Sequence, residues 1–455
     1  MKLKNKNVLV VGFGKTGKAV CDFLIQHNEP INIKVSESKN SPNQEISTYK
    51  RKGIEFETGG HQLQSFLDSD LIIPSPGVPP IPPVQKARKK GISILSEVEL
   101  ASRFLKGKII GITGSNGKST VASLVHGILK EGGLPSHLAG NIGTPLISFV
   151  EKSSREDIFV TELSSFQLEY IEKLAPAVSV LLNITPDHLD WHGSFSSYMK
   201  SKTNLLKNQN KNQIAVLNRD DPRVWSLRKQ GPEKVWAFSI KGQISQGCFR
   251  QREWIVLKNT TEQNVINTRD ILLKGIHNQE NVMASIILGH IFQVPLEIIR
   301  KSIMNFKGLE HRLEKVLSLK GVDFYNDSKA TNIDAALKSL MSFNKKIILI
   351  LGGRDKGDDF SRLKNEIKKR VKKVMALGEA RKKIIQTLGK YTEMTEVSSI
   401  KDAVEQGFVN SKPGEVILLA PACTSFDMFK NFEHRGQVFK QEVKKLSEKI
   451  KGNKV

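Results

Sequence analysis

Cysteine, long apolar runs and targeting segments are scarce in this chain of 455 residues. Its three cysteines, Cys21, Cys248 and Cys423, lie far apart without a CxxC pair, which argues against a disulfide framework and against a zinc site. No apolar run approaches the ~20 residues that span a bilayer, and the N-terminus leads into a short strand pattern rather than a signal sequence. These absences predict a cytoplasmic protein in a reducing compartment, without a membrane partner.

Acidic residues are also few relative to basic ones: 46 Asp and Glu against 70 Lys and Arg give a formal charge of +24. A charge of this size raises nucleic acid as a possible partner. The lysines are spread over the whole length, however, and do not interleave with aromatics in one segment, which favours a solvated Lys-rich surface. We therefore expect no nucleic-acid partner; tight, strongly salt-dependent duplex binding would revive that alternative.

The length and pattern predict several α/β domains. A chain of 455 residues with 39% hydrophobic residues exceeds what one core usually supports, so two to four domains are expected. Strand-like runs alternate with helical patterns near the N-terminus, from about residue 108 and again from about residue 309. Residues 213–270 interrupt this alternation with short strands and polar turns, which predict a β-rich flank of the second unit.

A glycine-rich turn near the N-terminus separates a strand from a helix. Gly12, Gly14 and Gly17 follow the apolar run, and Glu37 ends the next strand, twenty residues after Gly17. This is the arrangement of a dinucleotide-binding turn with its ribose-binding carboxylate. A nicotinamide-dependent dehydrogenase is therefore one alternative, but about 95 residues are too few for the full two-halved fold. That alternative also leaves the second glycine-rich turn unexplained.

The second glycine-rich turn, GITGSNGKST at residues 111–120, is the most informative stretch of the chain. It lies between a strand and a helix, so that backbone N–H groups and the helix dipole would converge on a phosphate. Lys118 would reach the terminal phosphates, and the Ser119 hydroxyl would bind Mg²⁺. The strict P-loop pattern has glycine where this chain has Ile112, and chance in a Lys-rich chain is the competing interpretation. The flanking elements favour phosphate binding, with Lys118 exposed at the helix N-terminus.

Polar residues also follow the later strands of this unit. Glu162 ends one apolar run, His188 follows the next, and Asn141 lies in a glycine-flanked loop. Because ligands bind beyond the carboxyl ends of parallel strands, we expect Lys118, Ser119, Glu162 and His188 to converge. A Glu at a strand end can instead serve a helix cap, and a lone His is often structural. Four such groups at one sheet edge favour a site.

The remaining motifs lie before a helix predicted at residues 282–292 and in the third unit. Asn278 precedes that helix and could contact a purine edge or simply cap the helix. Three turns of the third unit carry Lys329, Lys356 and Ser425. Together these three suit a dicarboxylate clamp, although each alone would be an ordinary loop residue.

Taken together, these motifs resemble the Mur ligase family along the whole chain and in order. Beyond the turn at 111–120, the segments that carry the resemblance are GNIGTP at 140–145, TELSSFQLE at 161–169, NITPDHLD at 183–190, GIHNQEN at 275–281, HR at 311–312, NDSKATN at 326–332, LGGRDKG at 351–357 and PACTSFDMFKNFEHRG at 421–436. The resemblance implies three α/β domains, each built on a mainly parallel sheet with flanking helices. It places a Rossmann-like UDP-substrate domain at 1–97, a P-loop ATPase-like centre at 98–308, and a Rossmann-like amino-acid-binding domain at 309–455.

The resemblance also implies an activity, the ATP-dependent addition of D-glutamate to UDP-N-acetylmuramoyl-L-alanine in peptidoglycan precursor synthesis. The L-Ala carboxylate would form an acyl phosphate, which the D-Glu amine then attacks. ATP and Mg²⁺ at two sites are the implied cofactors, and the expected partners are these small-molecule substrates, bound by a monomer. Other Mur-type ligases and a folylpolyglutamate-type ligase are the related alternatives, which substrate-dependent phosphate release distinguishes.

Site residues follow from the resemblance position by position. The ATP set comprises Gly114, Ser115, Asn116, Gly117, Lys118, Ser119, Thr120, Asn278, Arg312 and Asp327. The UDP-substrate set comprises Gly14, Lys15, Thr16, Glu37, Ser38, Ser75, Gly77, Asn141, Ser164 and His188. The D-glutamate set comprises Lys329, Thr331, Lys356, Ser425 and Phe432. The metal set comprises Ser119, Glu162, His188 and Lys202, and the implied catalytic residues are Lys118, His188 and Lys202.

Lys202 lies fourteen residues after His188 in a Lys-rich helical segment. Because Lys200 and Lys207 are close by, a solvated helix face is the simpler interpretation. Tyr198 and Lys202, however, form an i, i+4 pair on one helical face, and their spacing resembles that of the family's carbamylated lysine. A bare ammonium would be repelled by two Mg²⁺ ions, whereas a carbamate offers oxygen ligands that suit this cation. We therefore predict that Lys202 is carbamylated.

Overall fold

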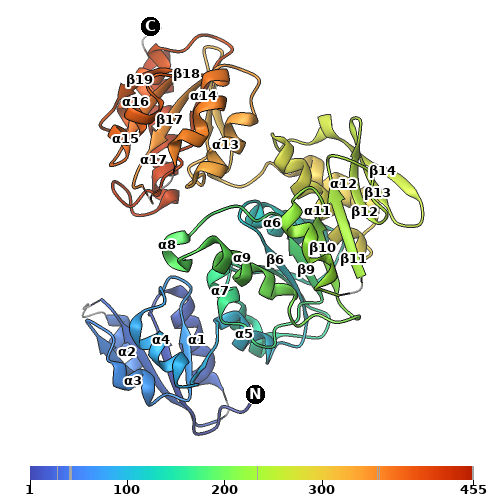
Figure 1. Cartoon of the computed structure of the whole chain (residues 1–455), viewed down its shortest axis with the longest axis vertical. Coiled ribbons are helices and arrows are strands. Elements are labelled where there is room, and N and C mark those ends of the chain that lie inside the picture. The colour runs from blue at the N-terminus through green and yellow to red at the C-terminus, as the bar shows by residue number, and fades with distance from the viewer. Residues whose placement is uncertain (28, 40–43, 233, 356, 358, 453–455) are drawn as a thin grey trace. The chain divides into compact units, whose positions relative to one another are not determined.

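A computed structural model describes residues 1–27, 29–39, 44–232, 234–355, 357 and 359–452. Three sheets organise the fold, with five, nine and six strands (Figure 1). The chain divides into two compact units: Met1–Thr268 with Glu280–Met304, and Arg269–Gln279 with Asn305–Val455. The predicted α/β class with mainly parallel sheets and flanking helices is confirmed. Among the described residues, no helix is both long enough and apolar enough to cross a membrane.

The first sheet is wholly parallel, in the order β3-β2-β1-β4-β5. Its elements are β1 (Asn7–Val11), α1 (Lys15–Gln26), β2 (Asn32–Glu37), α2 (Gln44–Arg51), β3 (Glu55–Thr58), α3 (Leu63–Leu67), β4 (Leu71–Pro74), α4 (Pro82–Lys89) and β5 (Ser93–Ile94). Residues of β1 alternate between two cores: Val8 and Val10 share one with α1, and Leu9 and Val11 share the other with α3 and α4. Both faces are thus covered, as parallel sheets require.

The second sheet has the order β14-β13-β12-β11-β10-β9-β6-β8-β7. Its elements begin with α5 (Glu97–Ser102), β6 (Lys108–Thr113), α6 (Lys118–Glu131), β7 (Ser136–Gly140), η1 (Leu146–Lys152), β8 (Ile158–Glu162), α7 (Ser165–Glu169), β9 (Val178–Leu181), α8 (Leu189–His192) and α9 (Phe195–Thr203). They continue with η2 (Asn204–Leu206), β10 (Ile214–Asn218), α10 (Pro222–Ser226), η3 (Leu227–Lys229), β11 (Lys234–Ser239), β12 (Gly247–Gln251), β13 (Trp254–Lys258), β14 (Glu262–Asn267), η4 (Thr268–Asp270), α11 (Ile276–Ile291) and α12 (Leu296–Asn305). The predicted β-rich flank corresponds to the antiparallel strands β12 to β14 with their neighbours β10 and β11.

One hydrophobic core joins the first and second sheets. Buried residues of β1 and α1, such as Val10 and Val20, belong to the same cluster as Phe159 of β8 and Leu217 of β10. Helix α5 contributes Val98 and Leu100 to it, at the point where the chain passes from one sheet to the other. The two sheets therefore pack as parts of a single unit.

The second unit is built on the sheet β15-β16-β20-β17-β18-β19, in which only the β15–β16 pair is antiparallel. Its elements are β15 (Glu314–Leu319), β16 (Val322–Asn326), α13 (Ile333–Met341), β17 (Ile347–Gly352), η5 (Phe360–Leu363), α14 (Lys364–Arg370), β18 (Val371–Leu377), α15 (Arg381–Leu388), β19 (Glu393–Glu396), α16 (Ile400–Val409), β20 (Val416–Leu419) and α17 (Phe432–Gly452). Helices α13, α14 and α15 cover one face, and α16 and α17 cover the other. Loops that follow these strands therefore gather at one edge of the sheet.

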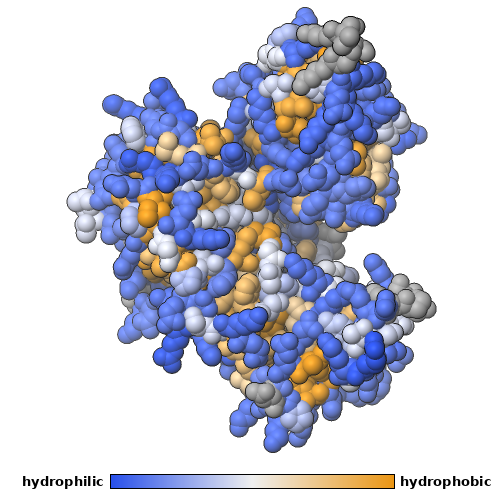
Figure 2. Space-filling view, turned by 180° about the vertical axis from the view of Figure 1, so that it is seen from behind, coloured by the Kyte–Doolittle hydropathy of each residue, from blue (hydrophilic) through white to orange (hydrophobic). Residues whose placement is uncertain are grey.

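On the face drawn in Figure 2 most residues are hydrophilic, and hydrophobic residues form separate patches among them. The more exposed large apolar side chains include Val409 at 82% and Phe426 at 61%.

Candidate active site

The turn predicted to bind phosphate lies between β6 and α6, the strand and helix expected from the sequence. Gly117 precedes the helix with φ of 91°, and a Cβ there would lie 2.4 Å from Oδ1 of Asn281, so only glycine fits. The amide of Asn183 braces the turn twice: its Oδ1 accepts from Asn116 N at 2.8 Å and its Nδ2 donates to Asn116 O at 3.0 Å. A rigid turn of this kind holds its N–H groups in place before the phosphate arrives.

Lys118 differs from the prediction in its exposure. It begins α6 as expected, but it is half-buried, because its Nζ donates to the carbonyl oxygens of Gly114 at 2.8 Å and Ser115 at 3.0 Å. The ammonium thus folds back over the turn instead of extending into solvent. Ser119 and Thr120 follow it and are buried in the first turn of α6.

Glu162 and Asn141 meet beside this turn. Glu162 ends β8 opposite Ile112 of β6, so the parallel register brings its carboxylate to the edge where the turn lies. Its side chain is 2% exposed, and its Oε1 accepts from Nδ2 of Asn141 at 2.8 Å. The expected gathering of these strand-end groups is therefore present for Glu162 and Asn141.

Lys202 is buried within the same group of residues. Its Nζ donates to Gly114 O at 2.9 Å and lies 4.7 Å from the ring centre of Tyr198. Burial, reinforced by the charge of Lys118, lowers the pKa of Lys202 well below its usual range, although Asp187 and Glu162 oppose the shift. The simple solvated-face interpretation is therefore wrong for Lys202, whereas Lys200 is exposed.

His188 precedes α8 in an unusual backbone conformation. Its φ is 52°, in the left-handed region that non-glycine residues seldom adopt. Its Nε2 lies 3.7 Å from Oδ2 of Asp187, a carboxylate close enough to Lys202 to affect its pKa. His188 thus lies beside a carboxylate that is near Lys202, while its predicted convergence with Lys118 and Glu162 stays a prediction.

The predicted UDP-substrate residues of the first sheet surround the turn after β1. A Cβ on Gly17 would lie 2.0 Å from Gly12 O, which explains the glycine, and Ser75 Oγ donates to Gly12 O at 3.1 Å. Glu37 accepts from the backbone N–H of Phe13 at 2.7 Å. Burial opposes its ionisation, but this bond and others hold the pKa of Glu37 below its usual value.

Other members of the UDP-substrate set lie in the same region. Gly14 caps α1, which begins with Lys15 and Thr16, and Lys15 Nζ donates to Gly143 O of the loop that carries Asn141 at 2.5 Å. The hydroxyl of Ser38 bonds Glu37, and Gly77 lies in the turn after β4. Ser164 caps α7 through reciprocal bonds with Gln167.

The ATP residues predicted downstream belong to the second unit. Burial raises the pKa of Asp327 to about 6, although the hydrogen bond donated by Ser339 and the positive charge of Arg312 both act to lower it. Helix α11 starts at Ile276, six residues before the predicted start, and Asn278 therefore lies within its first turn. Its Nδ2 donates to Lys274 O at 2.7 Å, a local bond to the preceding turn.

Members of the predicted D-glutamate set lie close together in the second unit. Lys329 Nζ lies 3.7 Å from the ring centre of Phe432, and Thr331 N donates to Lys329 O at 2.8 Å. Ser425 is buried on the loop after β20. Lys356 lies outside the described residues.

Arg435 links the two loops that carry Lys329 and Ser425, a role that was not predicted from the sequence. It is 1% exposed and donates to Ser328 O at 2.8 Å and to Cys423 O at 3.1 Å. Burial lowers its pKa to about 10. Asn183, which braces the turn, begins the NITPDHLD segment two residues after β9, but no role was predicted for it.

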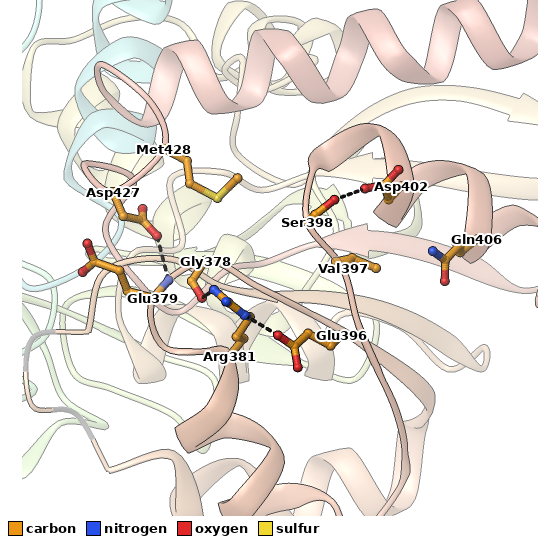
Figure 3. A pocket seen from close by; sticks show the side chains of 10 residues that line it. All are labelled: Gly378, Glu379, Arg381, Glu396, Val397, Ser398, Asp402, Gln406, Asp427 and Met428. Carbon is orange, nitrogen blue, oxygen red and sulfur yellow. Dashed lines mark hydrogen bonds and ion pairs between the residues drawn. The ribbon is translucent and has the colours of Figure 1, made fainter.

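A separate cavity of about 510 Å³ opens beyond the carboxyl ends of β18 and β19 (Figure 3). Among the residues that line it, Nε of Arg381 donates to Oε1 of Glu396, and Asp427 accepts from the backbone N–H of Glu379 at 3.0 Å. Of the predicted D-glutamate set, none of the four residues that the structure describes (Lys329, Thr331, Ser425 and Phe432) lines this cavity.

The residues at the phosphate turn suit Mg²⁺ held jointly with phosphate. Among the described residues no three His, Cys, Asp or Glu side chains form a metal cluster. Mg²⁺ commonly uses one or two carboxylates together with substrate phosphates and water, so a complete protein cage is not needed. The buried carboxylate of Glu162 and the hydroxyl of Ser119, at the edge where phosphate would bind, fit that requirement.

Models of three Mur ligase domains match the chain. The Mur ligase MurD-like N-terminal domain matches residues 6–96, the Mur ligase middle domain matches residues 112–289, and the Mur ligase glutamate ligase domain matches residues 311–423. These regions contain the first sheet, the phosphate turn and the second-unit sheet. The chain belongs to the Mur ligase family.

Proteins that are similar over their full length share one particular name within this family. The UDP-N-acetylmuramoylalanine–D-glutamate ligase of Koribacter versatilis (strain Ellin345) is 43% identical over 453 residues, which cover 99% of this chain and 100% of the relative. The ligase of the same name from Thermoanaerobacter sp. (strain X514) is 38% identical over 452 residues, covering 98% and 100%.

Solved structures share the fold at low sequence identity. A pseudomurein peptide ligase type C from Methanothermus fervidus has a TM-score of 0.61 at 18% identity, covering 97% of this chain and 100% of that one. UDP-N-acetylmuramate-alanine ligase MurC from Thermotoga maritima has a TM-score of 0.59 at 18% identity, with the same coverage. The three-domain α/β architecture is thus common to this chain and these ligases.

Proposed function

We propose that this chain is an ATP-dependent ligase that joins D-glutamate to UDP-N-acetylmuramoyl-L-alanine and releases ADP and phosphate. The observation that carries the proposal is the gathering of Lys118, Glu162 and Lys202 around a braced phosphate-binding turn. The names of the full-length relatives support the choice of D-glutamate as the added amino acid.

In the first step the substrate's terminal carboxylate attacks the γ-phosphate of ATP. Lys118 and the N–H groups at the start of α6 hold the phosphates and stabilise the charge that develops on the transferring group. Glu162 and Ser119 would hold Mg²⁺, which supplies further charge stabilisation when bound. Asn141 lies against Glu162 and is proposed to orient the substrate, as is His188.

In the second step the D-glutamate amine attacks the acyl phosphate and phosphate leaves. We propose that Lys356 and Ser425 bind the two carboxylates of D-glutamate, with Lys329, Thr331 and Phe432 nearby. Lys329 contacts Phe432, and Arg435 links the loops that carry Lys329 and Ser425, which supports a common site for these side chains. Asn278, Arg312 and Asp327 are proposed to bind adenine, phosphates and ribose.

The proposed substrates also suggest where and how the chain acts. ATP and a UDP-linked sugar are cytoplasmic metabolites, so we place the reaction in the cytoplasm. One chain carries residues for all three substrates, which supports action as a monomer.

Phosphate release tests the reaction directly. The full chain with ATP and Mg²⁺ should release phosphate only when UDP-N-acetylmuramoyl-L-alanine and D-glutamate are both present. L-glutamate should not replace D-glutamate, because the two carboxylates could not reach their partners with the amine in place. Release that depends on a folate substrate, or release that ignores the UDP-linked substrate, would contradict the proposal.

The amino-acid site has its own test. Lys356→Ala and Ser425→Ala should each raise the KM for D-glutamate about ten- to a hundredfold, because each removes a hydrogen bond to a charged carboxylate. Acyl-phosphate formation does not need these groups, so the KM for ATP should stay within about twofold. Lys364→Ala, at an exposed position on α14, is the matched control. A raised KM for ATP with an unchanged KM for D-glutamate would show that the site is misplaced.

A further inference from the structure

A series of polar side-chain contacts connects the first and last residues of α7 through α8 and α9. His192, the last residue of α8, faces Ser165 Oγ with Nε2 at 2.9 Å and Ser201 Oγ with Nδ1 at 3.4 Å. Ser201 Oγ in turn lies 2.6 Å from Oε2 of Glu169, at the other end of α7. Ser165 and Ser201 are 2% and 0% exposed, whereas His192 is half-buried, so the two hydroxyl groups depend on these contacts for their hydrogen bonds.

The chemistry of these groups indicates which atom donates and which accepts in each hydrogen bond. A carboxylate only accepts, so Ser201 donates to Glu169 over its shorter contact, in preference to Ser197 O at 3.0 Å. Ser201 can then accept from Nδ1–H of His192, which leaves Nε2 to accept from the Ser165 hydroxyl. His192 therefore joins the first residue of α7 to α9.

The same imidazole supports an aromatic residue that touches His188. Its ring stacks on Phe166 with centroids 5.8 Å apart and planes 10° apart. Phe166 meets His188 edge to face at 4.8 Å. Phe166 also contacts Trp191, whose Nε1 donates to Val78 O of the first-sheet region at 3.4 Å.

The helices involved are too short to hold these positions by themselves. Helix α7 has five residues and α8 has four, well below the length at which a helix is stable without packing. His188 additionally holds a left-handed backbone, which costs free energy unless its surroundings impose it. External support is therefore needed for both Ser164, which caps α7, and His188, which precedes α8.

We propose that His192 is a positioning residue that fixes the first turn of α7 and the ring of Phe166, and thereby places Ser164 and His188 for the UDP-linked substrate. This inference rests on the proposed function. It assigns His192 no contact with the substrate. The ion pair of Glu169 with Arg88 extends this series of contacts to α4, but the Arg88 side chain is 61% exposed, so the pair adds little.

The test separates the hydrogen bonds from the ring packing. His192→Phe keeps an aromatic ring against Phe166 but loses both serine contacts, and Ser201→Ala removes the link to Glu169. Each should raise the KM for UDP-N-acetylmuramoyl-L-alanine about five- to tenfold, as expected for the loss of one or two hydrogen bonds. The KM values for ATP and D-glutamate should stay within about twofold. His192→Gln, which can keep one serine contact, should recover part of the loss.

Controls distinguish positioning from a general effect on folding. Lys200→Ala, next to Ser201 on the exposed side of α9, should match wild type. Calorimetric titration with UDP-N-acetylmuramoyl-L-alanine alone should show the same weakening as the KM. Equal KM values in wild type and variants, or a fall in kcat with all three KM values unchanged, would overturn the inference. A wild-type chain that neither binds this substrate nor turns over would instead overturn the proposed function, and the inference with it.

Discussion

Lys118→Ala should retain the fold and lose nearly all turnover, with kcat lower by ~1000-fold or more. The Lys118 ammonium lies at the start of α6, where it can stabilise the negative charge that develops on the transferring phosphoryl group. Removing a comparable charge-stabilising group from other enzymes lowers kcat by about 100- to 100,000-fold. Phosphate release with all three substrates measures the loss. Lys130→Ala, at an exposed position in the last turn of the same helix, should remain fully active.

The melting temperature without ligands distinguishes this role from a structural one. Lys118 donates to two backbone carbonyls of the turn, so a modest shift of up to about 4 °C is expected from their loss. A fall of more than ~10 °C would mean that the side chain mainly holds the turn together. The assignment to phosphate transfer would then be wrong.

Lys202→Ala should also be nearly inactive, and a small carboxylic acid such as acetate or formate should restore part of the activity. The physical reason is that a buried, neutral Lys202 amine can attack CO₂, forming an N–C bond and releasing one proton, to give an anionic carbamate. The lowered pKa of Lys202 increases the fraction of neutral amine available near neutral pH. The added carboxylate would supply the missing oxygen ligands for Mg²⁺.

Isotope labelling tests the modification independently of turnover. Wild-type chain equilibrated with ¹³C-labelled CO₂ should give a carbamate carbon resonance that is absent from Lys202→Ala. Lys200→Ala should keep both the resonance and the activity, because that lysine is exposed. Full activity in Lys202→Ala, or loss of activity in Lys200→Ala, would rule out the carbamate.

Sequence pattern predicted the parallel part of the fold well because its strands are buried on both faces. The runs that became β8, β9, β17 and β20 are almost continuously apolar. The strands β15 and β19 were not predicted, since they lie at sheet edges and carry polar, partly exposed residues. Such short edge strands owe their conformation to their neighbours more than to their own composition.

Site residues that belong to one short sequence motif could be predicted. Features that depend on contacts between distant parts of the sequence were missed. Gly117 and Lys118 share one short motif, so the turn could be identified from its flanking elements. The burial of Lys202 and the half-burial of Lys118 arise from contacts with Gly114, and for Lys202 the partner lies 88 residues away in the chain. The contact of His192 with Ser165 could not be predicted from the sequence either, because the two residues lie in different helices.

The hydrophobic core shared by the first two sheets limits how the gene can be divided. A fragment ending near residue 97 would leave Leu95 and the partners of Val98 and Leu100 facing water, and the remaining fragment would expose the opposite side. We expect neither piece to fold alone, so the N-terminal domain of one Mur ligase cannot simply be exchanged for that of another by joining the chains at this linker. Grafts that change substrate preference would have to carry α5 and its packing partners with them.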